Sequence, residues 1–184
     1  IEKEVLAQKK INWLASVSVT SMILVITLSY HLIFPQLRIL IWYGLFLTLV
    51  FTQGIIYPII FQQTSRWLLF LDQTLVALAT FAAILFLGGI PWSGGLIIVG
   101  FALIFFSLNF KRKGHSVAIY IIYVITVVLA GILNPLLSVP PEMTPEVNIS
   151  LFVVNVLWIS GFAMVFVLSF ISQRVRVEQM ETIR

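Results

Sequence analysis

Few residues of this sequence could take part in chemistry, and they are scattered over long apolar stretches. Asp72 is the one acidic residue inside such a stretch, and Gln73 follows it directly. An acid inside a bilayer is costly and suggests function by default, such as a proton or cation relay. A relay needs a second deep ionisable group, which the sequence lacks, whereas Arg66 or the basic residues 111–113 could pair with Asp72. We therefore interpret Asp72 as one member of a structural ion pair, and the proton or cation relay is the alternative.

The two histidines, His31 and His115, do not form a metal site. They fall at opposite ends of the predicted helices, about a membrane thickness apart, so they cannot share a haem or a metal ion. The chain contains no cysteine, which excludes disulfides, Fe–S clusters and thiol catalysis. We predict no metal, no cofactor and no catalytic residue. His115 is predicted to be a solvated loop residue, and His31 an interfacial residue that alternatively senses pH or a ligand.

Neutral polar residues inside the apolar stretches can hydrogen-bond between helices. Gln53 and Tyr57 are four positions apart and share one helix face. Such bonds contribute about 1 kcal/mol each and hold bundles together; the alternative is a small polar ligand pocket. The candidate ligand-sensing or polar-core residues are Asp72, Gln73, Gln53, Tyr57, Asn155 and His31.

Two short motifs resemble functional sites, but we assign no binding or modification to either. The segment GGIPWSGG at 88–95 lacks the lysine and the following serine or threonine of a phosphate-binding loop, so it predicts a tight outer turn. The triplet NIS at Asn148 matches a glycosylation acceptor, which we treat as a chance match.

The composition indicates an integral membrane protein. Hydrophobic residues make up 60% of the 184 residues and charged residues 10%, with a mean hydropathy of +1.09. A bilayer core needs about 20 apolar residues per helix. We predict an all-α fold, a bundle of six transmembrane helices at Ile11–Phe34, Ile39–Phe61, Trp67–Leu87, Leu96–Phe110, Val117–Leu137 and Ile149–Ser172.

The basic residues predict the orientation of these spans. Ten of the 11 lysines and arginines fall on one side if every span crosses, and the other side holds Arg38 alone. Short basic loops stay in the cytoplasm. We therefore expect a multi-pass protein of the plasma (bacterial inner) membrane with both termini in the cytoplasm, and the basic loops argue against a nucleic-acid partner.

The last predicted helix does not stop where its apolar stretch ends. After Ile171 the sequence SQRVRVEQMETIR contains good helix formers and neither glycine nor proline. Phe170, Gln173, Val177 and Met180 continue a heptad spacing that starts at Phe166. We expect a signal-transmitting helix that pairs with its twin in a parallel homodimer; the alternative is an ordinary juxtamembrane helix.

This layout resembles the membrane sensor region of bacterial multi-span sensor histidine kinases. The exit SQRVRVEQMETIR is similar to the linker that joins the last span of such kinases to their cytoplasmic part. The layout is also similar to the six-span region of class III nucleotide cyclases. The histidine box of the kinases is absent, and GHSVAI at His115 does not match it. The resemblance implies a sensory domain fused to catalytic domains, and carries over no catalytic residue.

We expect the chain, which begins inside a charged helical segment, to be a piece of a longer protein. It divides into a cytoplasmic juxtamembrane helix at 1–10, a six-helix transmembrane domain at 11–172 and the start of a cytoplasmic signalling helix at 173–184. The predicted function is a sensory or anchoring domain of a sensor histidine kinase. The alternatives are the membrane domain of an adenylate or guanylate cyclase, and a small six-span transporter or channel with Asp72 on its path.

Overall fold

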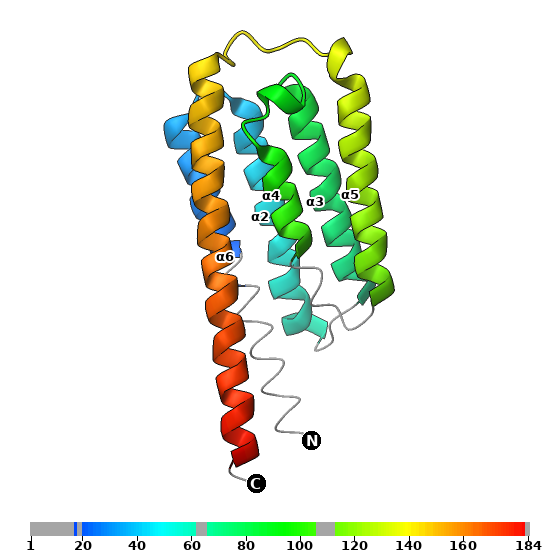
Figure 1. Cartoon of the computed structure of the whole chain (residues 1–184), viewed down its shortest axis with the longest axis vertical. Helices are drawn as coiled ribbons and strands as arrows, with labels where there is room; N and C mark the ends of the chain where they lie inside the picture. The colour runs from blue at the N-terminus through cyan, green and yellow to red at the C-terminus, as the bar shows by residue number, and fades with distance from the viewer. Residues whose placement is uncertain (1–16, 18–19, 62–65, 106–112, 183–184) are drawn as a thin grey trace.

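A computed structural model describes residues 17, 20–61, 66–105 and 113–182 of the chain. At 54–55, 57–61, 66–69, 102–105, 113, 115–116, 162 and 165–182 it describes the backbone alone. Over these ranges the chain is helical and contains no strand, which confirms the predicted all-α fold (Figure 1).

The helices follow the apolar stretches of the sequence. A first helix is described over Thr20–Ile33. It is followed by α2 (Arg38–Phe61), α3 (Arg66–Phe86), the 3-10 turn η1 (Ile90–Trp92), α4 (Leu96–Phe105), α5 (Lys113–Leu133), the 3-10 turn η3 (Asn134–Leu136) and α6 (Pro145–Thr182). Successive helices run in opposite directions, so the turns at 34–37, 87–95 and 134–144 lie together at one end of the bundle, here called the loop end (Figure 1).

Prolines and glycines set the helix ends at the loop end. The sequence predicts a fifth span that runs to Leu137, but α5 ends at Leu133 and gives way to η3. The cause is Pro135, which has no N–H to donate and restricts the backbone of Asn134 before it. The last helix begins at Pro145, the position where the fixed φ of proline favours a helix start.

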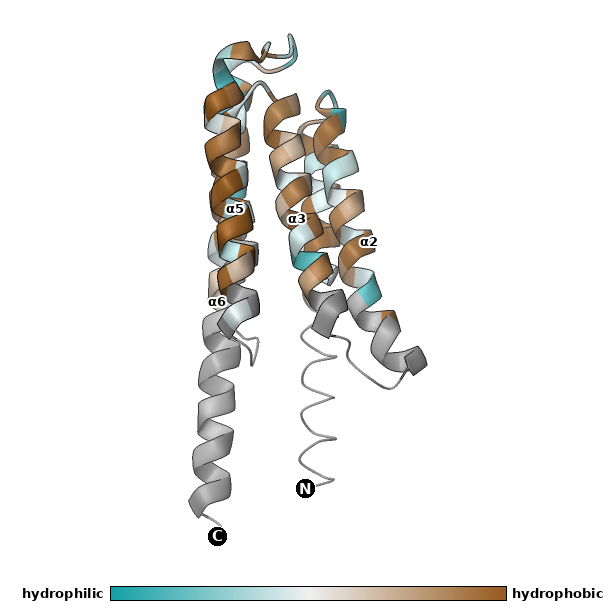
Figure 2. Cartoon of the chain, turned by 90° about the vertical axis from the view of Figure 1, so that its right-hand side faces the viewer, coloured by the Kyte–Doolittle hydropathy of each residue, from teal (hydrophilic) through white to brown (hydrophobic). Residues whose placement is uncertain are grey.

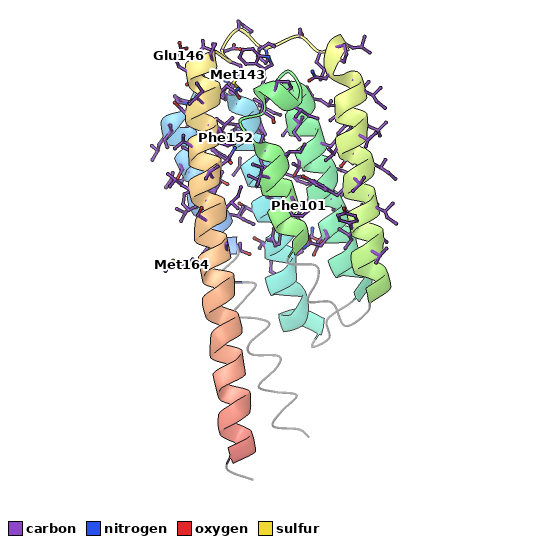
Figure 3. All side chains as sticks on the ribbon, in the orientation of Figure 1. Phe101, Met143, Glu146, Phe152 and Met164 are labelled. Carbon is purple, nitrogen blue, oxygen red and sulfur yellow. The ribbon has the colours of Figure 1, made fainter. Side chains whose placement is uncertain are left out.

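Thr144 caps the start of α6. Its side-chain oxygen accepts a hydrogen bond from the Val147 N–H at 3.4 Å, and its carbonyl accepts the first helical bond, from Asn148 N–H at 2.9 Å. Glu146 stands in the first turn at the loop end (Figure 3). Its pKa is lowered because its own backbone N–H and the Thr144 hydroxyl donate to its carboxylate.

Replacement of Thr144 with alanine is expected to lower the free energy of unfolding by about 1 kcal/mol, the usual cost of a lost N-cap.

Because the pKa of Glu146 is lower in the folded state, its carboxylate favours folding at neutral pH, and this contribution is lost as the pH falls through that pKa. Denaturant titration at neutral and acidic pH measures both effects. Ser150→Ala, at an exposed position of α6, is the matched control and should change stability little.

The bundle core is packed around α3, which contacts α2, α4 and α5. The largest cluster of buried apolar side chains lies in the half nearer the loop end and includes Phe34, Leu40, Leu87, Leu96 and Leu151. The first helix and α2 approach closely at Gly44, where a Cβ atom would lie 2.9 Å from Thr27 Cβ. The fold therefore brings every described helix into one apolar cluster, to which α5 contributes Ala130.

The outer surface of the bundle is apolar. The side chains of Val128 and Ile132 on α5 are 53% and 66% exposed, and that of Leu136 on η3 is 80% exposed. Hydrophobic colour covers most of α5 in Figure 2. Among the described residues, Val117–Leu136 is long and apolar enough to cross a membrane. The other described apolar helices, at Thr20–Ile33, Arg38–Gln53, Phe70–Phe86 and Pro145–Gly161, are shorter.

Candidate functional site

The turn between α3 and α4 is shaped by two pairs of glycines. Gly88 and Gly89 precede η1 with φ of 95°, and Gly94 and Gly95 follow it with φ of 53° and 73°. These positive values suit glycine, which has no Cβ. A Cβ on Gly94 would also lie 2.6 Å from Leu151 Cδ2. The turn therefore needs glycine at these positions, because its backbone is left-handed and packs closely against α6.

Asn148 in α6 bridges both sides of this turn. Its Oδ1 accepts a hydrogen bond from Gly94 N–H at 2.9 Å, and its Nδ2 donates to the Pro91 carbonyl at 2.9 Å. One side-chain amide thus satisfies a donor and an acceptor of a backbone that has left the helical pattern. The two bonds fix the turn to the first turns of α6.

Asn155 adds a second connection, two helical turns further along the same face of α6. Its Nδ2 donates to the Gly94 carbonyl at 2.7 Å, and its Oδ1 accepts a short hydrogen bond from the Tyr30 hydroxyl. Asn155 and Tyr30 are each 1% exposed. The group Tyr30, Pro91, Gly94, Asn148 and Asn155, here called the asparagine clamp, joins the first helix, the turn and α6.

A second set of hydrogen bonds crosses the bundle beside the clamp. The hydroxyls of Tyr43 in α2 and Thr80 in α3 are 3.0 Å apart, and Thr80 donates to the Val76 carbonyl at 2.8 Å. Because the Thr80 proton is engaged there, Tyr43 is the donor in the pair. In addition, the Tyr123 hydroxyl of α5 donates to the Ile97 carbonyl of α4. Each tyrosine thus ties two helices together.

Replacement of Tyr43 with phenylalanine is expected to lower the free energy of unfolding by about 1 kcal/mol, because one buried interhelical bond is lost while Thr80 keeps its bond to Val76. Tyr120→Phe is the matched control, since Tyr120 is 51% exposed. Equal stability of the two variants in a detergent unfolding titration would show that the Tyr43–Thr80 bond contributes nothing.

Asp72 and Gln73 form a separate polar group on α3. Both side chains are buried, at 4% and 7% exposure. Within the described part of the chain, no hydrogen-bond donor reaches Asp72 Oδ1 or Gln73 Oε1. The partners predicted for Asp72, the Arg66 side chain and residues 111–113, lie outside what the structure describes, apart from the backbone of Arg66 and Lys113.

The structure does not gather the predicted site residues into one place. Asp72 precedes Thr80 by eight residues, about 12 Å along α3 and away from the loop end, whereas Asn155 belongs to the clamp. Gln53 and His31 are exposed and therefore lie outside the buried polar core. The backbone of Tyr57 and His115 is helical, and their side chains lie outside the described part. His115 thus stands in the first turn of α5 rather than in a loop.

Several residues of this site were not singled out by the sequence. By sequence alone, Tyr30 and Thr80 look like ordinary span residues, and NIS at Asn148 looks like a chance sequon. The signal that could have found the clamp is the spacing of Asn148 and Asn155, seven positions apart and so on one helix face. A second signal is the glycine pairs, which indicate a turn whose backbone groups need partners.

The predicted signal-transmitting helix is the second half of α6. The helix is continuous from Pro145 to Thr182, so it does not stop at Ile171 where the apolar stretch ends. The residues Phe170, Gln173, Val177 and Met180 lie on this part of the helix. Their side chains are outside the described part, and the heptad seam remains a prediction.

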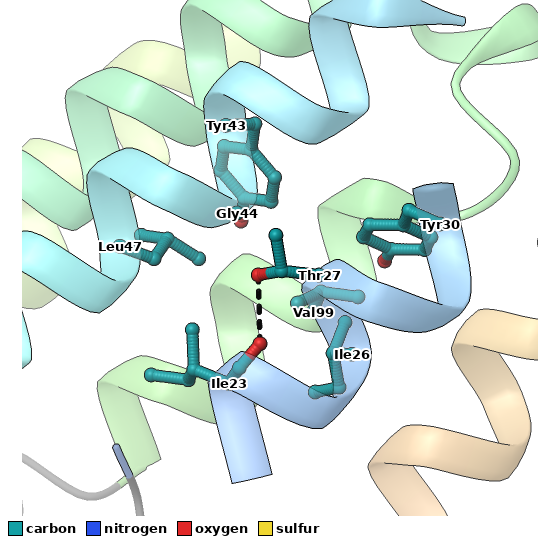
Figure 4. A pocket seen from close by; sticks show the side chains of 8 residues that line it. All are labelled: Ile23, Ile26, Thr27, Tyr30, Tyr43, Gly44, Leu47 and Val99. Atoms are coloured by element: carbon teal, nitrogen blue, oxygen red, sulfur yellow. Dashed lines mark hydrogen bonds between the residues drawn. The ribbon is translucent and has the colours of Figure 1, made fainter. Parts of the chain in front are cut away.

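A cavity between the first helix, α2 and α4 is too small for the ligand pocket that the sequence left open (Figure 4). Its volume is about 20 Å³, room for about one water molecule. Its polar lining groups are already engaged, since Thr27 donates to the Ile23 carbonyl at 2.8 Å and the hydroxyls of Tyr30 and Tyr43 bond elsewhere. The cavity lies where the first helix meets α2 and α4, and it offers no binding site.

The candidate functional features are therefore the asparagine clamp, which joins three parts of the bundle, and the long helix α6, which extends from it. Comparison of the chain with profiles of known protein families, with curated proteins and with solved structures gives no match.

Proposed function

We propose that this chain is the membrane sensory or anchoring domain of a signal-transduction protein, and that α6 carries the signal to a cytoplasmic catalytic part. The observation that carries this proposal is the continuity of α6. It is one helix of 38 residues, about 57 Å long. It starts in the asparagine clamp and runs past the described ends of α2, α3 and α5 (Figure 1).

The polarity of the bundle supports a place in the membrane. Polar side chains are buried, including Asp72, Gln73, Thr80 and Asn155, while large apolar side chains are exposed on each described helix. A soluble protein rarely exposes contiguous apolar surface of this extent. The length of α5, at 21 residues, matches the roughly 20 residues that cross a bilayer. The backbones of α2 and α3 are 24 and 21 residues long, although their described apolar stretches are shorter.

The distribution of basic residues supports six spans with both chain ends in the cytoplasm of a bacterial cell. In this arrangement the clamp lies at the outer end of the bundle, and the second half of α6 enters the cytoplasm. A parallel homodimer through the heptad positions of α6 would place two such helices side by side. A small tilt or rotation of these helices would then reach the downstream domains.

The resemblance of the exit helix to kinase linkers favours a sensor histidine kinase as the parent protein, with a nucleotide cyclase as the second choice. The test is a fusion of residues 1–184 to the catalytic part of a foreign histidine kinase in liposomes. Insertion of one to seven residues after Arg184 rotates the joined helix by about 100° per residue. Autophosphorylation should fall at intermediate insertions and return near seven. The proposal would be contradicted if the fusion remained monomeric and its autophosphorylation did not change with the length of the insertion.

A small transporter or channel is the second candidate, because the described residues leave Asp72 Oδ1 buried without a donor. The test is flux of protons and monovalent cations in liposomes that contain the whole chain, compared with Asp72→Asn, which keeps the shape of the side chain. We expect no flux that depends on Asp72. A flux that Asp72→Asn abolishes would replace the sensory proposal with transport.

A further inference from the structure

The first half of α6 has two faces that differ in their surroundings. One face points into the bundle, where Leu151 and Asn155 are 0% and 1% exposed and Asn155 belongs to the asparagine clamp. The opposite face carries large apolar side chains that are exposed, such as Leu157 at 67% and Met164 at 65%. One side of α6 therefore packs in its own bundle, and the other side is exposed in the single chain.

The heptad spacing predicted for the exit helix can be followed back into this first half. Counting back in steps of seven residues from Phe170 and from Phe166 gives five earlier positions: Ile149, Phe152, Val156, Ile159 and Ala163. These five residues are here called the bundle seam. Helix α6 is continuous through them and contains no proline after Pro145, so the helical register is unbroken.

The side chains of the bundle seam are not buried by the fold. Ile149, Phe152 and Val156 are 63%, 46% and 39% exposed. Ala163 is also exposed, and Ile159 is half-buried. If these positions packed inside the bundle, two α6 helices that pair beyond Ile171 would have to separate before they reached it. Because the positions are exposed, two copies of α6 can stay in contact along the whole helix.

Phe152 lies at the border between the bundle seam and the rest of the bundle. A Cβ on Gly95 would lie 2.8 Å from Phe152 Cδ2 and 3.7 Å from Ile98 Cδ1. The Phe152 ring thus covers the start of α4 and remains half exposed (Figure 3). The seam therefore runs along α6 beside its contact with α4, and it leaves the hydrogen bonds of the clamp undisturbed.

We propose that the bundle seam is the membrane part of a parallel homodimer interface, and that α6 of a second copy occupies it. This rests on the proposed function, because the register comes from the predicted heptads of the exit helix. A parallel pair is related by a twofold axis, so each seam residue meets the same residue of the second copy. Strict heptads give a left-handed crossing of about 20°, which is common between membrane helices.

The test is disulfide cross-linking of the whole chain in lipid vesicles, because the chain has no native cysteine. Val156→Cys and Ala163→Cys lie on the seam. Leu157→Cys and Met164→Cys are the matched controls, one residue further along and also exposed. A disulfide joins Cα atoms about 4.4–6.8 Å apart, so after brief oxidation the seam positions should give about tenfold more covalent dimer than the controls.

A second measurement avoids oxidation. Energy transfer between labelled chains in vesicles gives the Kd of the dimer. Val156→Trp places a larger side chain in the interface and should raise this Kd about tenfold or more, because overpacking costs about 1–3 kcal/mol. Leu157→Trp, outside the seam, should leave it unchanged. Equal effects of the two changes would overturn the proposal.

The cross-links also separate this proposal from the proposed function. Phe170→Cys and Val177→Cys report on the heptads of the exit helix. Cross-links at these two positions without cross-links at 156 and 163 would overturn the bundle seam and leave the paired exit helix intact. Equal cross-linking of seam and control positions, or of none, would also overturn it and would mean that lipid covers this face. Seam cross-links in a kinase fusion that does not respond to insertions would support the interface and contradict signal transmission.

Discussion

Replacement of Asn155 with leucine is expected to lower the free energy of unfolding by about 2–4 kcal/mol. The change leaves the Gly94 carbonyl and the Tyr30 hydroxyl, both bonded to Asn155, without their partner in a buried site. An orphaned buried polar group costs about 1–3 kcal/mol. Leucine has a similar size, so most of the loss reflects hydrogen bonding rather than a cavity. Unfolding in mixed detergent micelles, followed by circular dichroism, measures it.

A double-mutant cycle separates the two bonds of Asn155. In a Tyr30→Phe background the hydroxyl is already absent, so Asn155→Leu should cost about 1 kcal/mol less than in the unmodified chain. Ser160→Leu, an exposed position on α6, is the control for adding an apolar side chain and should be close to neutral. Additive effects of the Tyr30 and Asn155 changes would mean that the two side chains do not interact.

Replacement of Gly94 with alanine is expected to lower the free energy of unfolding by about 2–5 kcal/mol. The left-handed backbone at φ 53° costs about 1–2 kcal/mol for a residue with a Cβ. The new methyl group would also overlap the buried side chain of Leu151, and overpacking of this kind costs about 1–3 kcal/mol. The same unfolding titration applies.

Gly161→Ala is the matched control, because Gly161 lies in α6 and a Cβ there meets no atom within 4 Å. In a helix this change should stabilise by about 0.5–1 kcal/mol. The variant that combines Gly94→Ala with Leu151→Ala relieves the overlap and keeps the backbone strain, although it also opens space in the core. If Gly94→Ala were as stable as Gly161→Ala, the turn could not have the left-handed geometry that the clamp requires.

The helices could be predicted from the sequence because apolar stretches and helix breakers are local signals. The bounds of α2 and α3, Arg38–Phe61 and Arg66–Phe86, lie within one residue of the predicted spans. The end of α5 was predicted four residues too late, because hydropathy continues through Leu136 and Leu137 whereas hydrogen bonding changes at Asn134 and Pro135. Backbone chemistry overrides an apolar pattern at such points.

The site was less predictable because it depends on contacts between distant parts of the chain. The sequence identified Asn155 as polar inside a span, but its partners Tyr30 and Gly94 are 125 and 61 residues away. Gln53 was expected to bond between helices and lies exposed, since helix spacing does not say which face of α2 points inward. The partner of Asn148 is likewise the backbone of a turn: the glycine pairs indicate the turn, but they do not say which side chain bonds to it.

The most direct test of the account is the side of the membrane on which each end of α6 lies. The chain lacks cysteine, so Glu142→Cys and Thr182→Cys each provide one label site in intact bacterial cells. A membrane-impermeant maleimide added outside should label Glu142→Cys in intact cells. It should label Thr182→Cys only after the membrane has been permeabilised. Labelling of both from the outside, or of neither before permeabilisation, would show that α6 does not cross the membrane and would contradict the account.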